Sequence, residues 1–135
     1  MLNSALLIEK NPIIYNELGI VNTTIENFDE AIKYHKAGQI KDSTYWPNFI
    51  NEASIQMRLE KFDTAESILN RMINDCQSEY WKAQANLYLA VLYFNNGNQC
   101  EKSKDHLLKA KPIRNDLNLK KMYESFKQTI ENYCS

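Results

Sequence analysis

The stretch Glu26-Asn27-Phe28-Asp29-Glu30-Ala31 recurs as Glu60-Lys61-Phe62-Asp63-Thr64-Ala65, so that Glu, Phe, Asp and Ala all return after 34 positions. The same displacement relates two small residues upstream, Gly19 and Ala53. These matches in one register indicate an internal repeat. A period between about 20 and 50 residues is typical of repeat proteins and decides the fold before local structure is considered.

A third copy is looser, and its deviations are consistent with one another. Ala90 continues the series of Gly19 and Ala53, but it follows Ala53 by 37 positions instead of 34. The three added residues are placed in the connection around 75–79. Ser103 continues the series of Ala31 and Ala65, and it follows Ala65 by 38 positions, one more than the 37 found for Ala90. This further residue is placed in the turn at 96–100. Both insertions fall in predicted loops, where added length costs little free energy.

Glycine and proline are scarce, with three of each among 135 residues, whereas sheet-rich folds need turn residues every 8–12 positions or so. The chain is therefore predicted to be all-α, with helix boundaries uncertain by about two to four residues. The expected helices cover about 12–25, 27–38, 45–58, 61–75, 79–96, 100–111 and 116–133. The last carries an apolar stripe at helical spacing, consisting of Leu119, Met122, Tyr123, Phe126, Ile130 and Tyr133.

The 34-residue pattern resembles the tetratricopeptide repeat, and Tyr15-x-x-Leu18-Gly19 followed by Phe28-x-x-Ala31 is its clearest copy. The resemblance covers about residues 12–112. It implies a right-handed α-solenoid of antiparallel helix pairs, closed by a C-terminal capping helix, in one domain over 1–135. The repeats would span about 12–44, 46–77 and 79–112, with the cap at about 116–133. Three residues depart from the family pattern, namely Asn22, Glu52 and Gln56.

The resemblance also implies a concave groove lined by the first helix of each repeat. From its site positions we expect a peptide-binding groove formed by Asn16, Ile20, Thr23, Ile50, Asn51, Ser54, Met57, Gln84, Tyr88, Val91 and Asn95. Members that clamp the terminal carboxylates of chaperone tails use Lys, Arg and Asn side chains, of which only Asn51 is matched here. A carboxylate clamp is therefore rejected. The alternative for Leu87, Val91 and Phe94 is packing between repeats.

Several single residues carry expectations about helix ends and contacts. Asn27, Ser78 and Asp116 resemble N-caps, and Pro12 and Pro47 stand where helices should begin. Gly38 is expected to end a helix in the left-handed conformation, Gly97 to form a turn and Pro112 to mark a repeat edge.

The small residues Gly19, Ala53 and Ala90 on the first helices should contact Ala31, Ala65 and Ser103 on the second helices. Residues 5–8 would cover the front of the first repeat or end a preceding one.

The cysteines are odd in number and widely spaced, at positions 76, 100 and 134, without a CxxC pair. Neither a disulfide framework nor a zinc site is expected, and free thiols in a reducing cytoplasm fit best. Residues 1–10 lack the features of a secretory signal. The longest other apolar run, residues 87–94, is far below the roughly 20 residues that span a bilayer. No membrane association is predicted.

Catalysis is not expected, because His35 and His106 stand at packing or surface positions and no HExxH, GxSxG or phosphate-loop pattern occurs. No catalytic residue, metal or cofactor is predicted. The net charge is −4 over residues 1–75 and +3 over 76–135, and the basic part lacks the dense aromatic patch of a nucleic-acid binder.

The sequence thus predicts a non-catalytic module or adaptor that binds a peptide or helix of another protein. The alternatives are a self-associating scaffold subunit, including head-to-tail homo-oligomers, and a small helical enzyme or ligand-binding domain.

Overall fold

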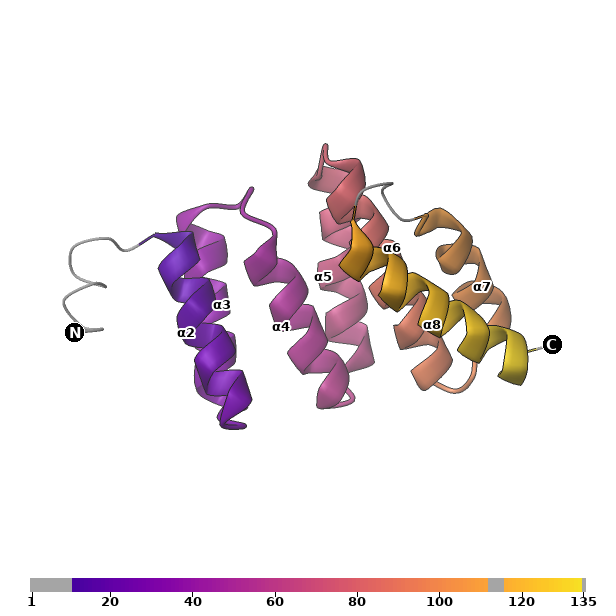
Figure 1. Cartoon of the computed structure of the whole chain (residues 1–135). Coiled ribbons are helices and arrows are strands. Elements are labelled where there is room, and N and C mark those ends of the chain that lie inside the picture. Colours follow the sequence, from indigo (N-terminus) through magenta and orange to yellow (C-terminus); the bar gives the residue numbers. More distant parts are fainter. Residues whose placement is uncertain (1–10, 112–115, 135) are drawn as a thin grey trace. The chain divides into compact units, whose positions relative to one another are not determined.

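The computed structural model describes residues 11–111 and 116–134, and within them it contains α-helices and no strand. The helices are α2 (Pro12–Thr24), α3 (Phe28–Lys41), α4 (Pro47–Arg58), α5 (Phe62–Asp75), α6 (Glu79–Asn95), α7 (Cys100–Lys109) and α8 (Leu117–Tyr133). Figure 1 shows their order along the chain. The all-α prediction is confirmed, and every helix begins and ends within three residues of its expected position. The expectations for residues 5–8 and Pro112 lie outside the described residues.

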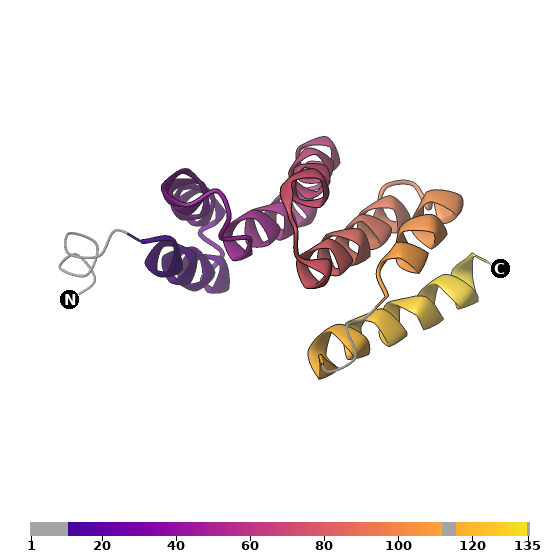
Figure 2. The same ribbon diagram turned by 90° about the horizontal axis from the view of Figure 1, so that it is seen from above.

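The chain divides into two compact units, an N-terminal unit over Met1–Ile68 and a C-terminal unit over Leu69–Ser135, with the boundary inside α5. In the N-terminal unit α2 packs against α3, and α4 packs against both. In the C-terminal unit α6 packs against α7, and α8 lies along both of them, as Figure 2 shows.

Side chains cap the starts of three helices, α2, α6 and α8. The Asn11 side chain accepts a hydrogen bond from the Ile14 amide at 2.9 Å, and Pro12 occupies the first position of α2. Ser78 and Asp116 cap α6 and α8 in the same way, by accepting from the amides three residues ahead. Asn27 occupies the N-cap position of α3, as predicted, but its side chain makes no capping hydrogen bond.

The turn between helices repeats in geometry as well as in sequence. Glu26 and Glu60 both adopt left-handed backbone angles, with φ of 62° and 60°. The next residue's amide donates back five positions in each case, Asn27 to the Asn22 carbonyl and Lys61 to that of Gln56, both at 2.8 Å. These are the bonds of a Schellman helix end.

The third turn confirms the predicted insertion at 96–100. There the Gln99 amide donates to the Tyr93 carbonyl at 2.9 Å, six positions back instead of five. Two consecutive residues, Gly97 and Asn98, take positive φ values of 82° and 53°. Gly97 is therefore a turn residue, as expected.

The other two glycines lie where helices approach closely. A Cβ atom at Gly19 would overlap the His35 ring on α3, which confirms Gly19 as a helix-contact position. Gly38 was expected to end a helix in the left-handed conformation, and this is wrong. It lies inside α3, where a Cβ atom would overlap the Asn48 amide on α4. The close approach of α3 and α4 explains this glycine.

The small residues at the pair contacts are all buried, and Ala31, Ala53, Ala65, Ala90 and Ser103 are completely inaccessible to solvent. The predicted contact between the small residues of a helix pair is confirmed directly in the C-terminal unit. There the Ser103 hydroxyl on α7 donates to the Ala90 carbonyl on α6 at 2.7 Å.

Candidate functional site

Seven of the predicted groove residues lie in the N-terminal unit, on α2 and α4, which pack against each other. The side chains of Asn16 and Asn51 form a contact between these helices. The Asn51 side-chain amide donates to the side-chain oxygen Oδ1 of Asn16 at 2.9 Å. Asn16 is only 6% exposed. Its side chain therefore joins two helices, and Asn51 keeps only the rest of its hydrogen-bonding capacity for a ligand.

The neighbours of this amide pair differ in accessibility. Ile50 is 4% exposed and belongs to the core, so it offers no free surface. Ser54 and Met57 on α4 are half-buried, as is Thr23 on α2, whose hydroxyl donates to the Gly19 carbonyl at 2.9 Å. Ile20 is 40% exposed.

Exposed apolar side chains extend along α2 beyond the predicted set. Ile13, Val21 and Ile25 are each more than half exposed, and Ile20 lies seven positions after Ile13. Residues at i, i+7 and i+8 lie on one side of a helix, and Ile25 follows α2 as its C-cap residue. We call these four residues the α2 strip. Ile13 and Ile20 stand at groove positions of the first repeat, and the predicted groove set kept only Ile20, although the i, i+7, i+8 and i+12 spacing was visible.

The four predicted residues of the C-terminal unit all lie on α6. Gln84 donates to the Tyr80 hydroxyl at 2.6 Å, Tyr88 and Val91 are half-buried, and Asn95 is exposed. Burial, with a smaller contribution from Tyr80, raises the pKa of Tyr88 above its usual value. Tyr88 therefore stays a neutral phenol, able to donate or accept a hydrogen bond.

Leu87 and Phe94 on α6, for which packing was the alternative to ligand binding, are packed within the C-terminal unit. Leu87 is buried in a cluster with residues of α7 and α8, and Phe94 packs against that cluster. Neither side chain is available to a ligand while α8 is in place.

A buried polar network lies inside the N-terminal unit, and the sequence reasoning missed it. His35 and Asn48 are both inaccessible to solvent, and the His35 Nδ1 lies 2.9 Å from the Asn48 Oδ1. The Asn48 amide also donates to the Pro12 carbonyl at 3.0 Å. One side chain of α4 therefore binds both α2 and α3.

These contacts assign the protonation of His35. The Asn48 amide nitrogen faces Pro12, so its oxygen faces His35 and Nδ1 must carry the proton. The His35 Nε2 is buried without a hydrogen-bond partner among the described residues. Burial lowers the pKa of His35 below 6.5, although Asn48 and the nearby Glu52 act in the opposite direction. His35 is a neutral, packed residue.

Glu52 extends the network along α4. Its two carboxylate oxygens accept from the Gln39 amide at 2.8 Å and the Gln56 amide at 3.1 Å, and the Lys36 ammonium lies 3.8 Å away. Glu52 and Gln56 are two of the three departures from the repeat pattern, and both are buried. Their i, i+4 spacing, continued from Asn48, was the available sequence signal for this network.

His106 lies in a comparable position in the C-terminal unit. Its Nδ1 is 2.9 Å from the Asn86 Oδ1, and its ring stacks on Tyr93 with centroids 5.3 Å apart. Both histidines are thus engaged by asparagine side chains, as packed residues.

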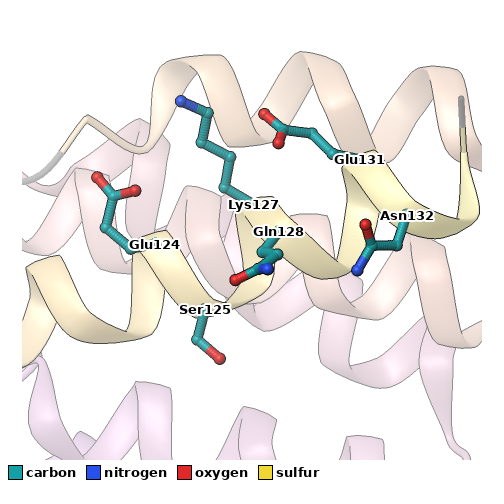
Figure 3. Close-up of a pocket in the computed structure, with 6 residues that line it drawn as sticks. All are labelled: Glu124, Ser125, Lys127, Gln128, Glu131 and Asn132. Atoms are coloured by element: carbon teal, nitrogen blue, oxygen red, sulfur yellow. The ribbon is translucent and has the colours of Figure 1, made fainter.

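The exposed face of α8 carries a shallow depression lined by six polar residues, shown in Figure 3: Glu124, Ser125, Lys127, Gln128, Glu131 and Asn132. All come from one helix, and their side chains spread in different directions instead of converging on one point. Functional pockets are usually built from several elements whose polar groups converge. The depression is therefore a solvated helix face.

The prediction of free thiols is wrong for two of the three cysteines. Cys100 and Cys134 form a disulfide with a Cα–Cα distance of 5.7 Å, while Cys76 is a free, buried thiol. The pairing follows from where α8 packs, because this places the C-terminal end of α8 beside the first residue of α7.

No protein-family model, no curated protein and no solved structure matches the chain. Over residues 11–111 and 116–134, no helix has the length and apolar character needed to cross a bilayer. In the same residues, no three His, Cys, Asp or Glu side chains are grouped so that they could hold a metal ion.

Proposed function

We propose that this chain is a helical repeat protein of the tetratricopeptide type, a right-handed solenoid with α8 as its cap, and that it acts as a non-catalytic adaptor for a peptide or helix of another protein. The recurrence of the Glu26 turn at Glu60, with the same hydrogen bonds after 34 residues, is the observation that carries this proposal. A repeated turn makes successive helix pairs equivalent, as stacking requires.

The proposed binding surface in the N-terminal unit is the α2–α4 face around the Asn16–Asn51 pair. Its accessible members are Ile20, Thr23, Asn51, Ser54 and Met57. Amide and hydroxyl groups can bond the backbone of a bound segment, while Ile20 and Met57 supply apolar contact. These five side chains are uncharged, and the two charges of the expected lining, Glu17 and Arg58, have opposite signs, which favours a weakly charged, partly apolar ligand.

We propose the same role for Tyr88 and Val91 on α6, with Gln84 and Asn95 beside them. A half-buried tyrosine supplies contact area at low cost in conformational entropy and keeps a polar group for its partner. This part is tested separately, by Tyr88→Ala.

A matched pair of serine substitutions tests the α2–α4 face. A library of displayed peptides is selected on the full chain, and the best peptide is titrated calorimetrically against Ser54→Arg on α4 and Ser67→Arg on α5. Ser54→Arg should weaken binding at least about tenfold, because its side chain fills the face. Ser67→Arg is exposed and outside the proposed surface, so its effect should be within about twofold. Equal effects of both variants would reject the assignment.

Self-association is the second candidate, and the exposed α2 strip favours it, because contiguous apolar surface on a helix is a common contact between copies. Opposite net charges, −4 for residues 1–68 and +3 for 69–135, also suit head-to-tail contact. Val21→Lys should then convert an oligomer to a monomer in sedimentation velocity. A wild-type chain that is monomeric at high concentration excludes this candidate.

The predicted cytoplasmic location has lost its main support, because it rested on free thiols. A Cys100–Cys134 disulfide persists best in an oxidising compartment. The redox state of its surroundings therefore decides whether the chain carries this bond.

A further inference from the structure

The C-terminal helix α8 is held on α6 and α7 by an apolar cluster. The buried members are Ala83, Leu87, Ala90, Leu107, Ala110, Leu119, Ile130 and Cys134. Tyr80, Phe94, Cys100, Tyr123 and Phe126 are partly buried against them. On α8 the contacts recur at i, i+4, i+7 and i+11, which is the pattern of an amphipathic helix lying in a groove.

Aromatic contacts fix where α8 lies along α6. The Phe94 ring meets Phe126 edge to face at 5.8 Å between centroids, and it lies 6.3 Å from the ring of Tyr133. Near the other end of α8, Tyr80 on α6 packs against the cluster, and burial, with a smaller contribution from Asp116, raises the pKa of that phenol. The α6 surface is thus contacted along most of the length of α8.

The disulfide closes a covalent ring around this contact. Cys100 is the first residue of α7, and Cys134 is the residue that follows α8. The polypeptide already joins the end of α7 to the start of α8. The two helices are therefore linked at both ends, over a sequence separation of 34. This ring limits how far α8 can move away from α7 while the bond is intact.

We propose that the α6–α7 surface under α8 is a second, helix-binding surface, and that the Cys100–Cys134 disulfide decides its occupant. In the oxidised chain α8 occupies it. In the reduced chain α8 is released and the surface accepts an amphipathic helix of a partner with the same apolar spacing. The proposal does not depend on the α2–α4 face.

The redox step is an ordinary thiol–disulfide exchange with a cellular dithiol. Its thiolate attacks the sulfur of Cys100, the less buried residue of the two, and Cys134 leaves and takes up a proton. The second thiol of the reductant then attacks the mixed disulfide and releases Cys100. Two electrons and two protons pass to the protein, and the dithiol becomes a disulfide.

The chemistry of the partner follows from the surface that α8 leaves. Ala83, Leu87 and Ala90 on α6 and Leu107 on α7 form an apolar floor without a charged side chain, with Phe94 at its edge. Because the side chains of Ala83 and Ala90 are small, this floor leaves room for large residues such as Phe126. A helix with Leu or Phe at i, i+4, i+7 and i+11 matches it, whereas an acidic or extended peptide does not.

Hydrogen exchange on the full chain tests the release of α8. Exchange of the amides of residues 120–133 is compared before and after treatment with dithiothreitol. Reduction should accelerate it on the order of 100-fold, because the ring no longer restricts the undocked state. Exchange in α6 and α7 should change much less. Cys100→Ser should reproduce the fast exchange, and dithiothreitol should then have no further effect.

A peptide of residues 116–134 with Cys134→Ser tests the second surface directly. Labelled with a fluorophore, it is titrated into full-length Ile130→Ala, whose own α8 competes less well. Binding should be at least about tenfold tighter to the reduced chain than to the oxidised one. A peptide with Phe126→Asp should not bind.

Three results would overturn the proposal. The first is equal protection of α8 in both redox states. The second is unfolding of α6 and α7 together with α8 on reduction, which would make the disulfide a general staple. The third is a reduced chain that exposes α8 to exchange and still fails to bind the peptide.

Discussion

The two units of this chain differ in how a third helix is held against a helix pair. In the N-terminal unit α4 inserts Asn48, Glu52 and Gln56 between its neighbours, and their hydrogen bonds join α2, α3 and α4. In the C-terminal unit an apolar cluster and a disulfide hold α8 on α6 and α7. Buried polar groups favour one exact geometry, because each lost partner leaves another group unsatisfied. Apolar contacts tolerate exchange of one helix for another.

The largest effect is expected for Asn48→Ala. It leaves the buried His35 Nδ1 and the Pro12 carbonyl without their partner, at a cost of about 4 kcal/mol in the free energy of unfolding. Urea unfolding measures the loss, and hydrogen exchange should locate it in α2–α4. Equal loss of protection in α6–α8 would show that the two units do not differ in this way.

Gly19→Ala is expected to cost about 2 kcal/mol, because the new methyl group meets the buried His35 ring. The helix propensity of alanine offsets this by roughly 1 kcal/mol or less. Combining Gly19→Ala with His35→Ala should cost less than the sum of the two single changes in a double-mutant cycle. Strict additivity would contradict the overlap.

Acid should weaken the N-terminal unit through His35. The pKa of His35 is lowered on folding, so its contribution is complete above about pH 6.5 and is lost as the pH falls towards the folded value. Glu52 on α4 and Lys36 on α3 are the charged groups nearest to this network. Between pH 7.5 and 5.5 the free energy of unfolding should drop by about 1 kcal/mol.

His35→Gln is the control for this pH dependence, because glutamine keeps an amide donor and does not titrate. The variant should lose most of the difference in stability between the two pH values. If the difference persists, other groups are responsible for it.

The smallest effect is expected for Ser103→Ala in the C-terminal unit. The change removes one hydrogen bond to the Ala90 carbonyl and places at this position the alanine found at Ala31 and Ala65. A loss below about 1 kcal/mol is expected in urea unfolding. A loss as large as that of Asn48→Ala would mean that the C-terminal unit also depends on polar contacts.

Helix positions and the repeated turns were predictable, because both follow from local pattern: the spacing of apolar residues and the recurrence of Glu26-Asn27-Phe28 as Glu60-Lys61-Phe62. Even the added residue at 96–100 appears as a six-residue hydrogen-bonded turn.

What escaped prediction depends on contacts between helices. A glycine at position 38 is compatible both with a helix end and with the close approach of another helix. Only the position of Asn48 on α4 decides between these two roles. Cys100 and Cys134 are bridged because α8 packs beside α7, which no cysteine spacing reveals. Part of the candidate site failed for the same reason, since Asn16 and Ile50 lie on the expected helices but are used in packing.

The covalent ring formed by the disulfide also changes how the chain carries mechanical load. A pull on the two ends of the protein would pass from Cys100 directly to Cys134, and the intervening parts of α7 and α8 would bear no tension. Reduction would bring these helices into the load path and allow the chain to lengthen by on the order of 110 Å. The same bond that selects the occupant of a surface thus sets how far the protein can be stretched.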